Sequence, residues 1–498
     1  MHDAMQGAVD QGIAVRAAAR TASNPRPLFA AAALLLAAAY LLGGSAGPMP
    51  GRAMLVELVA IAAILVVINN WTGPRPSKSV LIALVAVLGL PLVQLIPLPA
   101  QIWTAFPGRQ VATDVTRLID PAMWRPLTLD PNATLRTWFA LLVPVAMFLA
   151  IVQSSSRERL WLVIALVAIA IASAVLGLLQ ITSGSDLLYP FVSDHEGLPI
   201  GFFANRNHQA ALMYAALCFT IALTQIGFVT ERFPAARAVA AGVAILLIAT
   251  VFATGSRAGM VLMVVSLLLG LLIVFRSRIS WKSAIGGSAI LLIGSALLLN
   301  SGVVRDSVER LLSQSSDGRY EFWPEVLYSL SAYFPVGAGL GSFATSYQAT
   351  EQLATVGTHF VNHAHNDYLE VALEAGAPGI LLIGLLLLLY VRRTWQVLAR
   401  DPEDDANLLA RAAVIAILCL LLHGLVDYPL RTFGHLALFG MLAGLLFRPP
   451  GLTVVDEKRA NPEGMHQRGN LVQFPTVIEG GNGRQKQGRN ALERDSDE

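Results

Sequence analysis

Apolar runs of about 20 residues recur along the chain, and short polar connections separate them. A helix needs about 20 mostly apolar residues to cross the hydrocarbon core of a bilayer. Leu, Ala, Val and Ile fill these runs without the one-sided spacing of a soluble amphipathic helix. The pattern therefore predicts an all-α fold, a polytopic transmembrane bundle of about twelve helices. The predicted helices are 28–46, 53–71, 79–98, 135–153, 159–181, 208–228, 236–254, 257–275, 281–300, 368–391, 408–427 and 433–448.

Two connections are longer than the others, 99–134 and 301–367. The first contains Trp103, Phe106 and Trp124 among prolines, and we expect it to lie partly in the membrane–water interface because aromatic side chains gather there. The second is polar, and we expect it to be partly helical.

The chain divides into four predicted regions. A short cytoplasmic N-terminus covers 1–27, and N-terminal transmembrane helices cover 28–190. A second transmembrane region, 191–448, includes the long loop 301–367. The segment 449–498 is rich in Gly, Arg and Gln with few aromatics, which predicts a disordered cytoplasmic tail.

Basic residues gather in alternate connections, and this pattern predicts the orientation. Cytoplasmic loops of membrane proteins carry an excess of Lys and Arg. With both termini in the cytoplasm, every short inner connection is basic, and both long loops lie on the outer, periplasmic face. The basic residues of those inner connections are Arg16, Arg20, Arg26, Arg75, Lys78, Arg157, Arg159, Arg232, Arg237, Arg276, Arg278, Lys282, Arg392, Arg393, Arg400 and Arg411.

Composition agrees with a membrane protein and excludes some functions. The 498 residues are 55% hydrophobic and only 14% charged, and the mean hydropathy is +0.60. The net charge of +2, without a basic stripe, argues against a nucleic-acid partner. Cys218 and Cys419 both fall within apolar runs, so we interpret them as small core residues and expect neither disulfides nor a zinc site.

Three arginines of the outer face form a candidate anion site. In this orientation Arg206 and Arg257 lie where predicted helices begin, and Arg319 lies in the long loop. A helix N-terminus already carries a partial positive charge, so an arginine there is unfavourable unless an anion is near. Arginine binds phosphate oxygens through two parallel hydrogen bonds. The set therefore favours a diphosphate, although each arginine alone could be an interfacial or topology-setting residue.

His365 is the candidate for proton chemistry. An imidazole titrates near neutral pH and can accept a proton from an attacking hydroxyl. The alternative is a structural hydrogen bond at a helix start. The spacing of His363 and His365 would also allow metal binding together with His359 and Asp367, but further ligands are lacking nearby and we expect no metal.

Two further features stay open at this stage. Asp427, at the outer end of a predicted helix, could pair with an arginine of the site or simply end the helix before Pro429. The glycine-rich segment 336–341 is similar to a phosphate loop but lacks the following Lys-Ser/Thr, so we expect a turn.

These residues together resemble the O-antigen ligase and polymerase superfamily of bacterial membrane glycosyltransferases. Ligases of this group have a His followed by Asn, Ser or Gln, then nine residues and a Gly-x-x-Gly/Thr/Tyr segment. Here His365-Asn366 is followed by nine residues and then by Gly376-Ala-Pro-Gly379. The segments 255–259, 335–343 and 423–427 also resemble the family, and the likeness covers about residues 195–440.

The resemblance implies a GT-C-like fold and a glycan transfer at the periplasmic side of the inner membrane. The donor would be a glycan on undecaprenyl diphosphate, and the acceptor a sugar hydroxyl, typically on lipid A-core, in lipopolysaccharide biosynthesis. His365 would be the base that activates the acceptor, without a cofactor or a required metal, and the reaction would invert configuration. Arg257, Arg319 and Arg206 would hold the diphosphate. His363, Asn366, Asp427, Gly376 and Gly379 would support the site.

Three functions compete at this point. A ligase transfers the glycan to lipid A-core, whereas a polymerase, for O-antigen or exopolysaccharide, transfers it to another lipid-linked repeat unit. The His-Asn-x9-Gly-x-x-Gly spacing favours the ligase. A transporter or flippase of the same lipid-linked glycan would carry charges near the bilayer midplane and would have related halves. Here the charges concentrate at one rim instead.

Overall fold

The structure is a computed structural model that describes residues 26–47, 49–73, 75–183, 185–192, 197–274, 318–353, 356, 361–400 and 405–447. The described residues are helical apart from one two-stranded sheet. The elements are α2 (Arg26–Leu42), α3 (Pro50–Asn69), α4 (Lys78–Gln94), β1 (Pro97–Leu98), α5 (Ala100–Trp103), α6 (Gln110–Ile119), β2 (Arg125–Pro126), α7 (Pro131–Gln153), α8 (Ser156–Ser183), η1 (Asp186–Leu188), α9 (Arg206–Leu223), α10 (Gly227–Arg232), α11 (Ala236–Thr254), α12 (Arg257–Val274), α15 (Gly318–Tyr333), α16 (Phe343–Gln348), α17 (Asp367–Leu398), α18 (Asp405–His423), η2 (Pro429–Arg431) and α19 (Phe433–Leu446).

The all-α prediction is confirmed. Eleven of the twelve predicted segments overlap a helix, and the twelfth, 281–300, lies outside the described residues. Six described helices are long and apolar enough to cross a membrane: α3, α7, α8, α11, α17 and α18. Four shorter apolar helices, α2, α4, α12 and α19, accompany them. These helices indicate a multi-pass membrane protein, while the count of about twelve spans, the inward-facing termini and the four predicted regions stay predictions.

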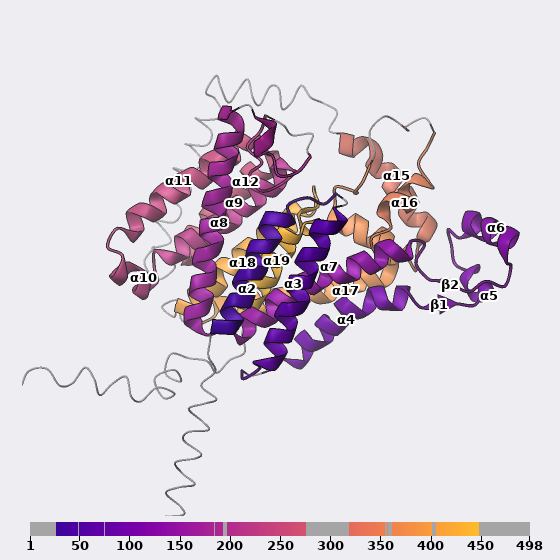
Figure 1. Ribbon diagram of the computed structural model, residues 1–498, viewed down its shortest axis with the longest axis horizontal. Helices are drawn as coiled ribbons and strands as arrows, with labels where there is room; N and C mark the ends of the chain where they lie inside the picture. The colour runs from indigo at the N-terminus through magenta and orange to yellow at the C-terminus, as the bar shows by residue number, and fades with distance from the viewer. Residues whose placement is uncertain are drawn as a thin grey trace, which may run out of the picture. The chain divides into compact units, whose positions relative to one another are not determined.

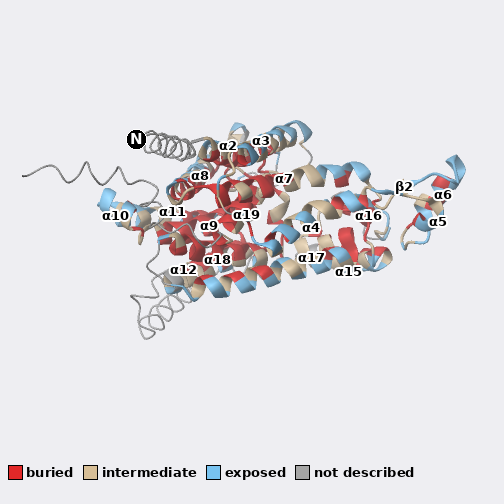
Figure 2. Cartoon of the chain, turned by 90° about the horizontal axis from the view of Figure 1, so that it is seen from below, coloured by how far each residue is buried: buried red, intermediate tan, exposed pale blue. Residues whose placement is uncertain are grey.

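Helix α9 forms the centre of the larger core. Every residue from His208 to Ala222 is buried, and α9 packs against α8, α11, α12 and α18 (Figure 1). Figure 2 shows this continuous buried interior. A helix that is apolar all round is expected when neighbouring helices surround it, so packing explains why α9 shows no amphipathic pattern.

A second group of helices packs on α7, which contacts α2, α3, α4 and α19. Gly440 and Gly444 of α19 lie so close to the backbone of α7 that a Cβ atom on Gly440 would come within 2.3 Å of the Pro144 carbonyl oxygen. Small residues allow such close approach between membrane helices. The 14-residue helix α19 is thereby held against α7 over most of its length.

Four helix starts meet at one end of the bundle, and polar side chains cap all four of them, with Ser256 accepting from the Gly259 amide at the start of α12. Asn205 caps α9, Asn366 caps α17 and Thr432 caps α19 by accepting backbone hydrogen bonds. At the start of α12, Ser256 donates a 2.7 Å hydrogen bond to the side chain of Asn207 and so ties α12 to α9. This end of the bundle is where the candidate catalytic residues lie.

Candidate functional site

His365 and Asp427 form a hydrogen-bonded pair between segments 62 residues apart. The Nδ1 atom of His365 lies 3.2 Å from Oδ1 of Asp427. The side chain of His365 is 27% exposed, whereas that of Asp427 is fully buried. With Nδ1 donating to the carboxylate, Nε2 becomes the ring nitrogen that can accept a proton, which is the arrangement of a histidine oriented by an acid.

The backbone around His365 is held in a specific conformation. His365 has a positive φ of 48°, and Asn366 directly after it begins α17. The Asn366 side chain accepts from the amides of Tyr368 and Leu369 and donates a 2.9 Å bond to the Leu425 carbonyl. Left-handed backbone in a non-glycine residue carries a strain of about 1–3 kcal/mol and tends to occur at functional sites. The cap therefore fixes His365 against the segment that carries Asp427.

Burial and hydrogen bonding shift the pKa of Asp427 in opposite directions. Burial alone would raise the pKa of its carboxyl group. The hydrogen bond from His365, together with the charges of His208 and His423, outweighs burial and lowers this pKa below its usual value. Asp427 is therefore ionised at neutral pH and can hold the His365 ring in one tautomer.

Tyr428 lies at the centre of a group of histidine rings. Its ring centroid is 4.4 Å from that of His363, 4.7 Å from that of His365 and 5.3 Å from that of His208. His208 is in the first turn of α9, so Tyr428 connects this helix start to the start of α17. Sequence reasoning assigned no role to Tyr428.

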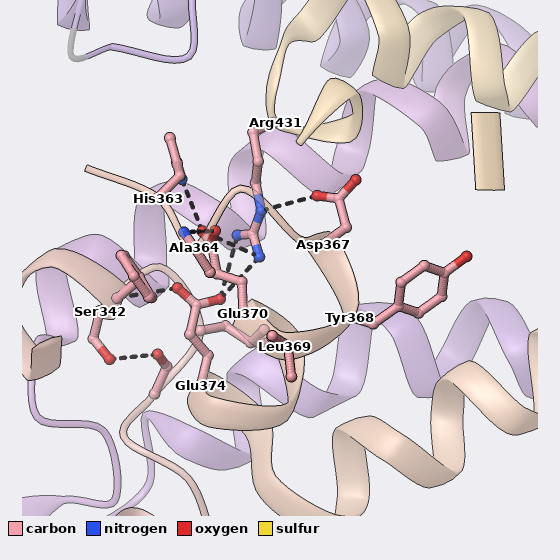
Figure 3. Close-up of polar contacts among 12 residues, drawn as sticks. Ser342, His363, Ala364, Asp367, Tyr368, Leu369, Glu370, Glu374 and Arg431 are labelled. Carbon is pink, nitrogen blue, oxygen red and sulfur yellow. Dashed lines mark hydrogen bonds and ion pairs between the residues drawn. The ribbon is translucent and has the colours of Figure 1, made fainter. Parts of the chain in front are cut away.

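Next to this pair, a half-buried arginine is surrounded by carboxylates. The guanidinium of Arg431 lies 3.2 Å from Glu374, 3.4 Å from Glu370 and 3.7 Å from Asp367, as Figure 3 shows. Burial would lower the pKa of Arg431, but these three acids raise it above its usual value. We name the five residues Asp367, Glu370, Glu374, Arg431 and His363 the arginine cluster.

His363 belongs to this cluster. Its Nδ1 atom lies 2.8 Å from Glu370, whose other oxygen accepts from the Ala364 amide at 2.9 Å. Burial disfavours the imidazolium, yet the adjacent carboxylate outweighs it and raises the pKa of His363. The Nδ1 atom of His363 is hydrogen-bonded to Glu370, and its ring packs against that of Tyr428. We therefore interpret His363 as a structural residue next to His365.

The two glycines of the spaced motif lie at a kink in α17. Gly376 has φ 57° and ψ −145°, which interrupts the helix. A Cβ atom there would come within 2.1 Å of the Pro335 carbonyl oxygen. A Cβ atom on Gly379, about one helical turn further along, would lie 2.6 Å from Cβ of Ala375. Glycine is therefore required at 376 both for its backbone conformation and for the close approach of the loop that begins at Pro335.

The glycine-rich segment 336–341 packs onto that kink as a turn, as expected. The amides of Ala338 and Gly339 donate to the carbonyl oxygens of Leu373 and Glu374, at 3.1 and 2.7 Å. The Leu340 amide donates to the side chain of Gln94. These three donors serve the protein's own structure and are not available to cradle a phosphate group.

The structure brings two of the three predicted anion-binding arginines together. Arg206 and Arg257 are the first residues of α9 and α12, and Nη1 of Arg206 lies 3.6 Å from the position that a Cβ atom of Gly255 would take. Arg206 is half-buried and Arg257 is exposed. The side chain of Arg319, in the first turn of α15, lies outside the described residues, as does His359. Within the described part of the chain, no group of three or more His, Cys, Asp or Glu side chains has the geometry of a metal site.

The sequence analysis assigned no role to Glu370, Glu374 or Arg431, and it considered Asp367 only as a possible metal ligand. A signal existed: Asp367, Glu370 and Glu374 are spaced three and four residues apart, and so lie on one face at the start of an apolar helix. Charges in such a helix are costly unless they are paired. No local pattern, however, identifies Arg431 as the partner.

A comparison with protein families gives an independent result. The family described as O-antigen ligase matches residues 242–384. The matched range includes Arg257, His365 and both glycines of the α17 kink, while Asp427 and Arg431 follow it. No curated protein matches the chain. The match agrees with the resemblance seen in the sequence: residues 242–384 are similar to the O-antigen ligase family, and the apolar helices around them indicate a membrane protein.

Proposed function

We propose that this protein transfers a glycan from undecaprenyl diphosphate to a sugar hydroxyl, as an O-antigen ligase, with His365 as the general base. The observation that carries the proposal is the pair of a partly exposed His365 and a fully buried, ionised Asp427. The family match at residues 242–384 supports the reaction class.

His365 would act on the acceptor. As the acceptor oxygen forms its bond to the anomeric carbon, Nε2 of His365 takes the hydroxyl proton, and Asp427 stabilises the imidazolium that results. The glycosidic carbon–oxygen bond to the diphosphate breaks in the same step, and attack from the opposite face inverts the anomeric configuration. A positioned base of this kind contributes about 10²–10⁴-fold to a rate.

The arginines would act on the leaving group. Negative charge grows on the departing diphosphate, and fixed cations stabilise that charge most in the transition state. In this proposal Arg206 and Arg257, the first residues of α9 and α12, would do this, and the N-termini of these helices would add their own positive potential. Arg319 completes the set in our proposal. Arg431 is excluded from it because three carboxylates already surround its guanidinium.

The test replaces His365 in a strain deleted for this gene. His365→Ala and His365→Gln are expressed at the unsubstituted level, and surface glycan and lipid-linked intermediates are compared on gels. Gln can still donate a hydrogen bond to Asp427 but cannot take up a proton near neutral pH, so it preserves the local packing. Both variants are expected to lose surface glycan. An unchanged glycan profile in both would disprove the role of His365.

The intermediates that accumulate identify the acceptor. Full-length undecaprenyl-linked polymer is expected, because a ligase acts after polymerisation. Single repeat units would instead assign the chain as a polymerase, with the same base and the same donor. A reporter fused after residue 340 tests the periplasmic position of the site, and a cytoplasmic signal there would contradict both the orientation and the donor side.

A further inference from the structure

The helix α6 exposes its apolar face and packs two threonines against the protein. Val111, Val115, Leu118 and Ile119 recur at helical spacing on one side, and they are 51–88% exposed. On the other side Thr113 and Thr116 are each only 7% exposed. This is the reverse of a helix on the surface of a soluble domain, where the apolar side faces the core.

The buried side of α6 is fixed by specific contacts. Arg125 donates hydrogen bonds to the Thr116 hydroxyl and to the Ala112 carbonyl oxygen. The guanidiniums of Arg109 and Arg125 lie over the ring of Trp103, at 5.5 and 5.2 Å from its centroid. Trp103 is thus buried within the protein, whereas Trp124 is exposed. These contacts prevent α6 from rotating its apolar face inward.

The position of α6 along the chain points to the lipid surface. α6 lies between α4 and α7, two apolar helices, and joins each of them through one two-residue strand of the β1–β2 pair. Exposed apolar side chains continue from the last part of α4, at Leu92, Val93 and Ile96, up to β1. Figures 1 and 2 both place α5 and α6 beyond the ends of α4 and α7.

A further contact links α6 to the end of the bundle that holds the candidate site. Arg109, the residue before α6, donates a 3.0 Å hydrogen bond to the Gly337 carbonyl. Gly337 in turn packs against Glu374 and Gly376 at the kink of α17. Arg109 therefore connects α6 to the kink of α17.

We propose that α6 lies flat in the membrane–water interface, with Val111, Val115, Leu118 and Ile119 inserted among lipid acyl chains. An interfacial helix of this kind buries its apolar face about 5–10 Å into the boundary between headgroups and chains. The exposed Trp124 fits the same depth because its ring is partly apolar and partly polar. The inference does not depend on the glycan transfer.

The test places one reactive cysteine on each face of α6. The chain has two cysteines, Cys218 and Cys419, both buried, so the unsubstituted protein serves as the blank. Leu118→Cys reports on the apolar face. Arg117→Cys and Asp114→Cys are matched controls on the same helix, where the side chains are 68% and 74% exposed. The full chain is reconstituted in nanodiscs of phosphatidylethanolamine and phosphatidylglycerol and labelled with a fluorophore.

The free cysteine at position 118 should react slowly with a charged aqueous thiol reagent, and, in a separate sample, a fluorophore attached there should be quenched strongly by lipids that carry doxyl near the headgroup. The cysteines at positions 114 and 117 should react fast, and fluorophores attached to them should be quenched weakly. Equal labelling rates at 118 and 117 would overturn the proposal. Protection at 118 without lipid quenching, together with cross-linking between two chains, would also overturn it and assign the face to self-association. Val111→Cys repeats the test at a second apolar position.

Discussion

Two polar clusters lie side by side at the start of α17 and differ in how their charges are satisfied. In the first, the buried acid Asp427 holds the ring of His365, which is partly open to solvent. In the second, three acids surround the guanidinium of Arg431, and the adjacent His363 bonds one of them. The first has a group that can still exchange a proton with a substrate, whereas the acids of the second are paired with Arg431.

The comparison teaches that unusual residues beside a reactive centre need not take part in the reaction. The arginine cluster connects the first turns of α17 to η2, the short helix that follows Tyr428. It therefore holds together the two segments that carry His365 and Asp427. We expect substitutions in the first cluster to affect the rate of transfer, and those in the second to affect folding.

The largest expected effect is a loss of glycan transfer rate when Asp427 is replaced. Asp427→Asn should lower the glycan transfer rate about 10²–10⁴-fold, because the amide can stabilise neither the imidazolium nor the required tautomer of His365. Its melting temperature should stay close to that of the unsubstituted protein. The transfer rate is measured in membranes that contain equal amounts of each protein. A variant with full activity would remove Asp427 from the site.

The second-largest expected effect is a loss of folding stability when Arg431 is replaced. Arg431→Met leaves the buried carboxylates of Glu370 and Glu374 and the half-buried one of Asp367 without their cation, and breaking a buried ion pair in this way costs about 3–5 kcal/mol. Intrinsic tryptophan fluorescence during thermal unfolding in detergent gives the melting temperature. Arg117→Met, which breaks an exposed pair with Asp114, is the matched control and should change little. If Arg431→Met melted normally but lost activity, Arg431 would belong with the reactive cluster.

A smaller loss of stability is expected from a substitution at Gly376, where the kink separates the start of α17 from the rest of that helix. Gly376→Ala forces a side chain into left-handed backbone and against the Pro335 carbonyl, at a cost on the order of 1–3 kcal/mol. Gly384→Ala in the same helix is the control, because a Cβ atom there meets nothing within 4 Å. Equal melting temperatures for the two variants would show that the kink is not needed.

The smallest effect is a pH dependence of stability that originates in the arginine cluster. The pKa of His363 is raised in the folded protein above its ordinary value of 6.5. Its contribution is therefore complete below pH 6.5 and is lost as the pH rises through the higher folded pKa. The melting temperature of the unsubstituted protein should fall over that range, and His363→Gln should remove this part of the decline. The same decline in both proteins would exclude His363 as its source.

The sequence predicts the helices of the bundle well because each apolar run is a local property. The starts of α9 and α12 at Arg206 and Arg257 agree with the expected positions. The cap at Asn366 and the kink at Gly376 also fall within the spaced motif that suggested the family.

The pairing of the site residues could not be predicted in the same way. The sequence allowed two interpretations of Asp427, a partner for an arginine of the site or a residue that ends its helix. In the structure its partner is instead His365, just before the start of α17. Such a contact depends on how α17 and α18 pack, and hydrophobic periodicity does not specify this. The reversed orientation of α6 was also missed, because its pattern alone does not say which face meets the protein.

The kink at Gly376 has a consequence for the thickness of membrane that this protein can inhabit. Both glutamates of α17 precede the kink, and the segment 377–398 contains no acidic residue. At about 1.5 Å per residue this segment alone spans about 33 Å, close to the hydrocarbon core of a bilayer. The helix can therefore cross the lipid with a length that carries no carboxylate, while the acidic turn stays above the hydrocarbon. Arg392 and Arg393, near the other end of this segment, can reach the opposite interface. A thicker or thinner bilayer would change the tilt of the segment 377–398 before it forced either glutamate into lipid.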